Sequence, residues 1–275
     1  MPRQARIDAP GALHHVIARG IDRCKIFRDD ADRDDLLLRL GRLLPETETS
    51  CYAWALIPNH FHLLLKTGNV PVATIMRRLL TGYAAGFNRR HRRSGHLFQN
   101  RYKSILCQED AYLSELVRYI HLNPLRARIV RDLETLDSYP YAGHCALMGK
   151  QKIDWQSTDS VLTLFGSKLS HARSNYHNFV AEGVEQGRRP ELVGGGLIRS
   201  AGGWSGVQQL RKNGIYQKSD ERILGDSTFV ESVLAETEEK MASQYALKSK
   251  GIDLPRLQRL AAALTDISPE ALTGP

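Results

Sequence analysis

The 275-residue sequence contains no run of about 18 apolar residues, the length that a helix needs to cross a bilayer. Its N-terminus, MPRQARIDAPG, also lacks the apolar core of a secretory signal. Neither membrane insertion nor export is therefore expected. We expect a protein that works in the cytoplasm.

Cysteines are few and scattered. None of the four, Cys24, Cys51, Cys107 and Cys145, belongs to a C-x-x-C pair. This argues against a disulfide framework and a cysteine zinc site, and it fits a reducing compartment. The sequence has no internal repeat or low-complexity tract. Its hydrophobic fraction of 42% is typical of a globular protein, and its length allows one or two domains.

Acidic residues are missing from one long stretch. Between Thr49 and Gln108 there is none, against nine basic residues: Lys66, Arg77, Arg78, Arg89, Arg90, Arg92, Arg93, Arg101 and Lys103. The net charge of +8 comes entirely from residues 1–150, because the rest of the chain has equal numbers of basic and acidic residues. A solvated surface usually mixes both signs, so this stretch favours a polyanionic partner, first of all nucleic acid. The alternative is a basic surface without a partner.

Strand and helix signals alternate along the first half of the chain. Strands are predicted at 14–21, 51–57, 60–66 and from about Tyr102 to Cys107, and helices at 30–44, 72–93 and 109–123. Pro45 is expected to end the first helix and Pro124 the third. The order βαββαβ followed by a helix is typical of the α+β class. It predicts a ferredoxin-like or RNA-recognition-like antiparallel sheet with helices on one face.

The second half has a different character. The segments WQSTDSVLTLFGS and HARSNYHNFVAEGVEQG indicate helices, and GGGLIRSAGGWSG (194–206) indicates a glycine-rich loop. Another helical block follows. The last segment predicts a helix, a turn and the start of a second helix. We therefore predict domains at 1–145, 146–250 and 251–275.

The stretch IPNHFHLLLK (57–66) places two histidines on a predicted strand just after a turn. Alternation puts His60 and His62 on one face and Phe61 on the other, so both imidazoles can bind one divalent metal. A third ligand is needed. The helix 109–123 offers Glu109, Asp110, Glu115, His121 and Asn123. The structural alternative is a pair of half-exposed packing residues at a sheet end.

These motifs carry a resemblance to a known family. PNHFHLL, followed about sixty positions later by RYIHLNPLRA, resembles the single-tyrosine HUH transposases, specifically the REP-associated tyrosine transposases. GALHHVIARG and RYKSILC extend the resemblance over about the first 145 residues, which implies an HUH catalytic domain there. The last segment resembles the beginning of the helix-turn-helix domain of bacterial replication initiators, and it stops before the expected recognition helix. The alternative is a short helical tail.

The resemblance implies the roles of the site residues. Tyr119 would be the nucleophile, and His60, His62 and Asn123 would hold the metal; related insertion-sequence transposases have glutamine where this chain has Asn123. Tyr119 and Asn123 are four residues apart, on one helical face. Tyr112, seven residues before Tyr119, is the rival nucleophile. We interpret His121 as structural or DNA-facing.

The implied activity is a metal-dependent DNA strand transfer. A bacterial enzyme of this kind cleaves and rejoins single-stranded, hairpin-bearing DNA through a 5′-phosphotyrosine, with Mg²⁺ or Mn²⁺. We expect it to be nucleoid-associated, and a homodimer is left open. The densest basic cluster is predicted to track DNA phosphates: Arg89, Arg90, Arg92, Arg93, Arg101 and Lys103. The alternatives are a solubilising helix end for the cluster, a non-catalytic nucleic-acid-binding protein on the same fold, and a hydrolase that uses metal and water.

Overall fold

The computed structural model describes residues 7–187, 189–194 and 219–249. The chain divides into two compact units, Met1–Val230 and Glu231–Pro275. The first contains the β-sheet, and most of the helix α11 (Ser227–Ser249) belongs to the second. Within the described residues, no helix combines the length and the apolar character needed to span a bilayer.

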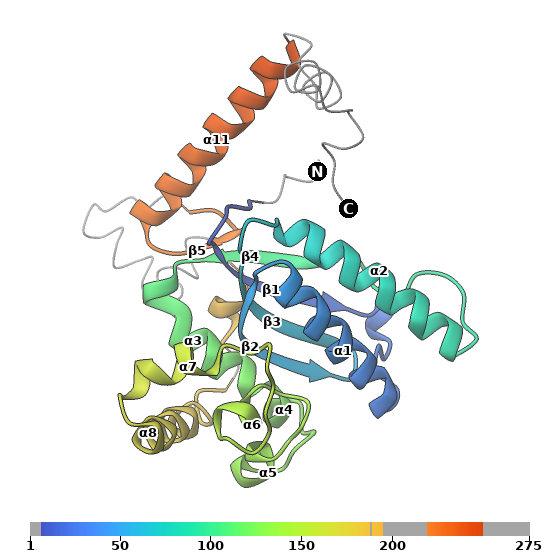
Figure 1. Cartoon of the computed structure of the whole chain (residues 1–275), viewed down its shortest axis with the longest axis vertical. Helices are drawn as coiled ribbons and strands as arrows, with labels where there is room; N and C mark the ends of the chain where they lie inside the picture. The colour runs from blue at the N-terminus through green and yellow to red at the C-terminus, as the bar shows by residue number, and fades with distance from the viewer. Residues whose placement is uncertain (1–6, 188, 195–218, 250–275) are drawn as a thin grey trace, which may run out of the picture. The chain divides into compact units, whose positions relative to one another are not determined.

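The sheet of the first unit has five strands in the order β2-β3-β1-β4-β5 (Figure 1). The first four are β1 (Leu13–Arg19), β2 (Ser50–Ile57), β3 (His60–Lys66) and β4 (Lys103–Cys107). They pair antiparallel, and the two-residue β5 (Ile223–Leu224) joins β4 in parallel. The predicted α+β class is confirmed, with this short strand as an addition that makes the sheet mixed.

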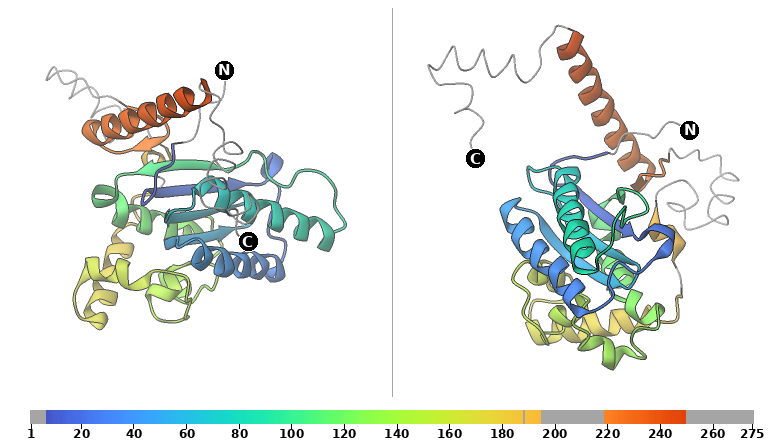
Figure 2. Two further views of the ribbon diagram at one scale, coloured as in Figure 1. Left: turned by 45° about the horizontal axis from the view of Figure 1, so that its top comes forward. Right: turned by 90° about the vertical axis from the view of Figure 1, so that its right-hand side faces the viewer.

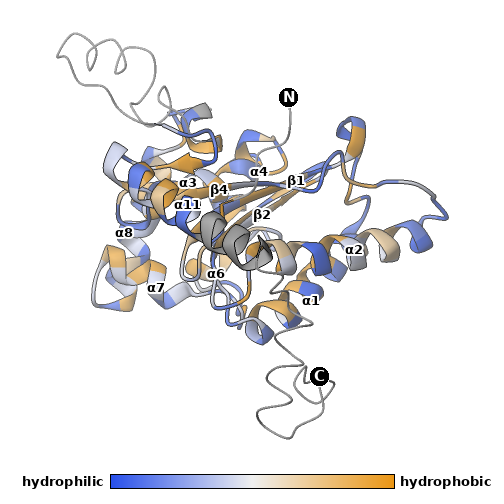
Figure 3. Cartoon of the chain, turned by 90° about the horizontal axis from the view of Figure 1, so that it is seen from above, coloured by the Kyte–Doolittle hydropathy of each residue, from blue (hydrophilic) through white to orange (hydrophobic). Residues whose placement is uncertain are grey.

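Two helices, α1 (Asp30–Glu46) and α2 (Val72–Arg90), cover one face of the sheet. Figure 2 shows them side by side. Their apolar residues, such as Leu40 and Leu79, share a core with Trp54 and Phe61 of the strands. In Figure 3 the strands of this core are coloured as hydrophobic, whereas the end of α2 is coloured as hydrophilic. Burial of that apolar surface is what holds both helices on this face.

The other face is covered by α3 (Glu109–His121), α4 (Asn123–Arg126) and the helices that follow. These are α5 (Leu133–Asp137), α6 (His144–Leu147), α7 (Thr158–Leu162) and α8 (Leu169–Glu182), with short 3₁₀ turns including η3 (Pro190–Val193). Leu116 of α3 packs in one core with Leu64 of the sheet and Tyr176 of α8. The predicted helical character after residue 145 is thus confirmed for the described part. The predicted domain boundaries at 145 and 250 stay predictions.

Some element ends differ from the sequence prediction. Pro45 lies inside the last turn of α1, which runs on to Glu46. The predicted end of α2 at residue 93 was three residues too late, because Arg92 has a φ of 48° in the left-handed region, where a helix cannot continue. Residues 195–206 of the predicted glycine-rich loop and the predicted helix-turn-helix-like segment 251–275 lie outside the described residues.

Candidate active site

The histidine pair lies on the sheet face that α3 covers. β3 begins at His60, directly after the turn that Pro58 and Asn59 form. His62 is 3% exposed and His60 is half-buried, whereas Phe61 is fully buried in the core on the α1 and α2 side. The alternation predicted from the sequence therefore places both imidazoles on one face.

The two rings lie close together and are electrically neutral at pH 7. Their centroids are 5.1 Å apart and their planes are 73° apart. Burial, followed by the charge of Arg19, lowers the pKa of His60 to about 4. Burial, followed by the neighbouring His15 and His60, lowers the pKa of His62 well below its usual value. Neutral imidazoles keep a nitrogen lone pair, which is the form that binds a metal.

Each histidine of the pair has its Nδ1 in a hydrogen bond. The Nδ1 of His60 lies 2.6 Å from Asn59 Oδ1. The Nδ1 of His62 lies 2.9 Å from Nε2 of His15, a fully buried histidine on β1. The nitrogen that remains on each ring for a ligand is therefore Nε2.

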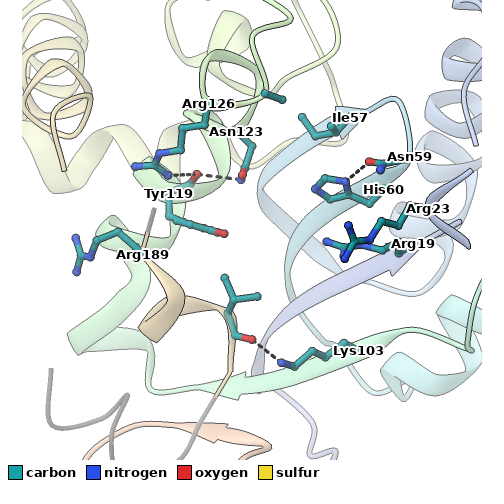
Figure 4. Close-up of a pocket in the computed structure, with 12 residues that line it drawn as sticks. Arg19, Arg23, Ile57, Asn59, His60, Lys103, Tyr119, Asn123, Arg126 and Arg189 are labelled. Carbon is teal, nitrogen blue, oxygen red and sulfur yellow. Dashed lines mark hydrogen bonds between the residues drawn. The ribbon is translucent and has the colours of Figure 1, made fainter. Parts of the chain in front are cut away.

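Tyr119 comes from α3 and faces the histidines across the site. The centroid of its ring lies 6.0 Å from that of His62, at an interplanar angle of 80°. Tyr119, His60 and Asn123 line one cavity of about 670 Å³. Figure 4 shows the phenol of Tyr119 directed into this cavity, across from His60. The predicted nucleophile and the predicted ligand pair thus come together within a single chain.

The amide of Asn123 is held in a fixed direction. Its Nδ2 donates hydrogen bonds to the backbone carbonyls of Tyr119, at 3.0 Å, and Ile120, at 3.2 Å. The nitrogen is thereby turned back to the helix, which leaves Oδ1 as the amide atom suited to a cation. α3 ends at His121, and Asn123 opens the one-turn helix α4, so the predicted single helix 109–123 is divided here.

The cavity is strongly positive. Its lining includes five basic side chains: Arg19, Arg23, Lys103, Arg126 and Arg189. Of these, sequence reasoning identified only Lys103. Arg19 stands directly opposite His60 in the β1–β3 register, so knowledge of the strand pairing would have found it. Arg189 lies far along the chain from every motif and gave no signal. A cavity with this charge is suited to a phosphate group.

Arg126 contacts both the ring and the backbone carbonyl of Tyr119. Its guanidinium carbon lies 5.2 Å from the centroid of the Tyr119 ring, and Nη1 donates to the Tyr119 carbonyl at 3.2 Å. A cation at this distance from an aromatic ring is attracted to its π electrons. The spacing of seven residues, two helical turns, is the sequence signal that could have pointed to this pair.

The other candidates on α3 have different surroundings. Glu109 forms an ion pair with Lys66 at 2.7 Å, and Glu115 forms one with Arg118 at 2.6 Å. Asp110 is exposed. The remaining two, His121 and Tyr112, pack toward the core: the Nδ1 of fully buried His121 lies 2.8 Å from the hydroxyl of Tyr176, and Tyr112 packs against the same apolar cluster. None of these five lines the cavity.

The predicted DNA-contacting cluster divides into two groups. Arg90 pairs with Asp32 at 2.5 Å, Arg93 donates to the His96 carbonyl, and Lys103 donates to the Val193 carbonyl at 2.6 Å. The other members are exposed and form no ion pair within the described part of the chain: Arg89, Arg92 and Arg101. Their charge is available to a phosphate backbone.

A second group of acidic and histidine side chains lies where α1 begins and α2 ends. Among the described residues, Asp29, Asp32 and His91 are close enough together to share a cation. However, the buried Asp32 carboxylate already accepts hydrogen bonds from Arg90, at 2.5 Å, and from His91, at 2.9 Å. Its charge is therefore compensated, and the group ties the two helices together.

Two comparisons with known proteins found a match. The family model described as "Transposase IS200 like" matches residues 10–123, a segment that includes both histidines, Tyr119 and Asn123. This match confirms the predicted transposase resemblance over that segment. A solved structure, "Structure of the REP associates tyrosine transposase bound to a REP hairpin", is similar with 15% identity and a TM-score of 0.46, covering 57% of this chain and 92% of that one. No curated protein matches.

Proposed function

Because residues 10–123 match the IS200-like transposases, we propose that this protein is a DNA strand transferase that cleaves and rejoins single-stranded, hairpin-bearing DNA through a 5′-phosphotyrosine. The observation that carries the proposal is the meeting of Tyr119, His60 and Asn123 at one positive cavity. A phenol, metal-binding donors and phosphate-binding cations are the parts that this reaction needs. The nucleoid-associated location and the homodimer stay predictions.

The donor set fits a divalent cation. Nε2 of His60, Nε2 of His62 and Oδ1 of Asn123 would hold it, with DNA and water supplying the remaining ligands. Two neutral imidazoles and one amide oxygen suit Mn²⁺ and accept Mg²⁺. When bound, the cation polarises the phosphoryl oxygens and so lowers the barrier to attack. The cations that line the cavity neutralise the charge of the same phosphate.

The chemistry proposed for Tyr119 is a reversible exchange of phosphate esters. The phenolic oxygen forms a bond to phosphorus while the bond to the 3′ oxygen breaks, and the phenolic proton is lost as the 3′ oxygen gains one. A later attack by a 3′-hydroxyl reverses these steps and restores the tyrosine. The phosphodiester is conserved as an ester at each stage, so no ATP is required. The phenol, with a usual pKa near 10, needs its developing negative charge to be stabilised.

Replacing Arg126 with glutamine is expected to slow formation of the covalent adduct about tenfold, because the guanidinium beside the Tyr119 ring stabilises the developing phenolate. The measurement is the single-turnover rate at saturating DNA. Arg131→Gln is the matched control, since the Arg131 side chain is 84% exposed, and its rate should equal that of wild type. An Arg126→Gln protein with an unchanged rate would contradict this role.

Replacing Arg89, Arg92 and Arg101 together with glutamine is expected to weaken binding of single-stranded DNA without regard to its sequence. Each lost phosphate contact reduces the slope of log affinity against log salt by about 0.7, so the triple variant should lose about 2 units of slope. Fluorescence anisotropy over a range of salt measures this. The control variant changes three exposed cations elsewhere: Arg131, Lys150 and Lys152. Equal losses in both variants would mean that the cluster has no special role.

A further inference from the structure

A third imidazole, that of His15, lies against the predicted metal ligands. His15 is in the middle of β1, where Ile17 pairs with His62 and His15 itself pairs with Leu64. His15 and His62 are therefore diagonal neighbours on one face of the sheet. Their ring centroids are 5.2 Å apart, with the planes inclined by only 27°. His15 is fully buried, and the function proposed above gives it no task.

Both ring nitrogens of His15 are engaged in hydrogen bonds. Nδ1 lies 3.1 Å from the backbone carbonyl of Leu192, and Nε2 lies 2.9 Å from Nδ1 of His62. A carbonyl oxygen can only accept, so Nδ1 of His15 must carry a proton. A fully buried imidazole that pairs with no carboxylate in the described part of the chain stays neutral, so the ring carries that single proton. Nε2 of His15 is then an acceptor.

The protonation of His62 follows from that of His15. Because Nε2 of His15 accepts, the shared hydrogen bond requires a proton on Nδ1 of His62. A neutral His62 then has its lone pair on Nε2. The opposite tautomer of His62 would carry a proton on the nitrogen that is needed as a ligand. It would also set two lone pairs against each other, 2.9 Å apart, in a buried place.

His60 shows the same arrangement with a different partner. The only acceptor on the Asn59 amide is Oδ1, which lies 2.6 Å from Nδ1 of His60, so this nitrogen is the donor. Nε2 of His60 is left with the lone pair. Two independent partners, an amide and an imidazole, thus give both histidines of the pair the same tautomer. This agreement argues that the contact of His15 serves the site and is not packing alone.

We propose that His15 is a positioning residue that holds His62 in the tautomer and ring orientation required for binding a divalent metal through Nε2. It is not a third ligand, because neither of its nitrogens has a lone pair to spare. The inference rests on the metal site of the proposed function. It also assigns a part in that site to the Leu192 carbonyl, which lies outside the segment 10–123 that matches the transposase family.

Replacing a group that hydrogen-bonds to a metal ligand typically lowers metal affinity by about 10- to 100-fold. His15→Leu removes the acceptor and should lower Mn²⁺ affinity by this factor. His15→Gln keeps an acceptor in Oε1 and should retain most of the affinity. The matched control is His14→Leu, since His14 is equally buried on the same strand and bonds to Ser104 on the opposite face. It should bind Mn²⁺ like wild type.

Two measurements on the full chain test the proposal. Electron paramagnetic resonance of added Mn²⁺ gives the affinities, and ¹⁵N chemical shifts of histidine rings in the metal-free protein give the tautomers, with His62→Ala used for assignment. Wild-type His62 should show a protonated Nδ1 alone, and His15→Leu should show a mixture of both tautomers. A merely structural role for His15 would not alter the tautomer of His62 in a folded variant.

The outcomes separate this inference from the function on which it rests. Should Mn²⁺ binding by wild type be insensitive to His62→Ala, both the metal site and the role of His15 are overturned. Should it depend on His62 while a folded His15→Leu binds as wild type does, only the inference fails. If His15→Leu does not fold, the wild-type spectrum still decides, because a proton on Nε2 of His62 contradicts the proposal.

Discussion

Replacing Tyr119 with phenylalanine should abolish the covalent link between this protein and DNA, with a loss of at least about 1,000-fold in adduct formation, because no other group replaces the missing nucleophile. The assay uses a hairpin-bearing oligonucleotide labelled at its 3′ end, since a 5′-phosphotyrosine retains the fragment on the 3′ side of the cut. After incubation with Mn²⁺ and denaturation, wild type should carry label and Tyr119→Phe should carry none.

The matched control for this experiment is Tyr112→Phe. Tyr112 lies seven residues earlier on the same helix, packs against the core and does not line the cavity. Its variant should form the adduct at the wild-type rate. DNA affinity should stay within about twofold of wild type in both variants, since only one hydroxyl is lost and the phosphate-binding cations remain.

Three other results would each indicate a different mechanism or activity for this protein. Label retained by Tyr119→Phe would move the nucleophile to another tyrosine. Cleavage without a link to protein, retained in Tyr119→Phe but lost in His62→Ala, would indicate a hydrolase that uses metal and water. DNA binding without cleavage by any variant would indicate a binding protein on this fold.

Replacing His62 with alanine should remove both metal binding and strand cleavage. His62 is 3% exposed and neutral, with its ring 5.1 Å from that of His60, so its loss takes away one of two imidazole ligands. We expect Mn²⁺ affinity and cleavage rate each to fall at least about 100-fold. This loss is larger than that expected from replacing a residue that only hydrogen-bonds to a ligand, such as His15. Removal of metal from wild type with EDTA should stop cleavage in the same way, and added Mn²⁺ should restore it.

The control here is His14→Ala, which removes an equally buried histidine from the opposite face of the neighbouring strand. Circular dichroism should show both variants folded. Cleavage by a folded His62→Ala protein at the wild-type rate would remove the metal site from the proposed mechanism and would leave Tyr119 with the basic side chains alone.

The sequence predicted the parts of the fold that local patterns determine. The strand 60–66 was predicted with correct ends, because a turn at Pro58 and Asn59 precedes an alternating run. The strand β5 was not predicted, since two residues carry no pattern and its partner β4 lies more than a hundred residues earlier. Element ends that depend on one backbone angle, such as that of Arg92, were also missed.

In the candidate site, too, the sequence predicted the residues of short local motifs and missed those that only the fold brings in. The histidine pair and the tyrosine stand in short motifs that the sequence displays directly. His15 and Arg19 reach the site only through the register of β1 against β3, and Arg189 only through the path of the chain after α8. Such residues become visible when the fold brings distant segments together. The roles of His60, His62, Tyr119 and Asn123 stay predictions until they are measured.

Mass spectrometry of the digested adduct identifies the residue that attacks the DNA, which we expect to be Tyr119. Trypsin cuts after Arg118 and Arg126, so Tyr119 is the single tyrosine of the peptide YIHLNPLR, while Tyr112 falls in SILCQEDAYLSELVR. After nuclease and trypsin digestion, we expect a 5′-linked nucleotide on YIHLNPLR. A nucleotide on SILCQEDAYLSELVR, or cleaved DNA with no modified peptide, would contradict it.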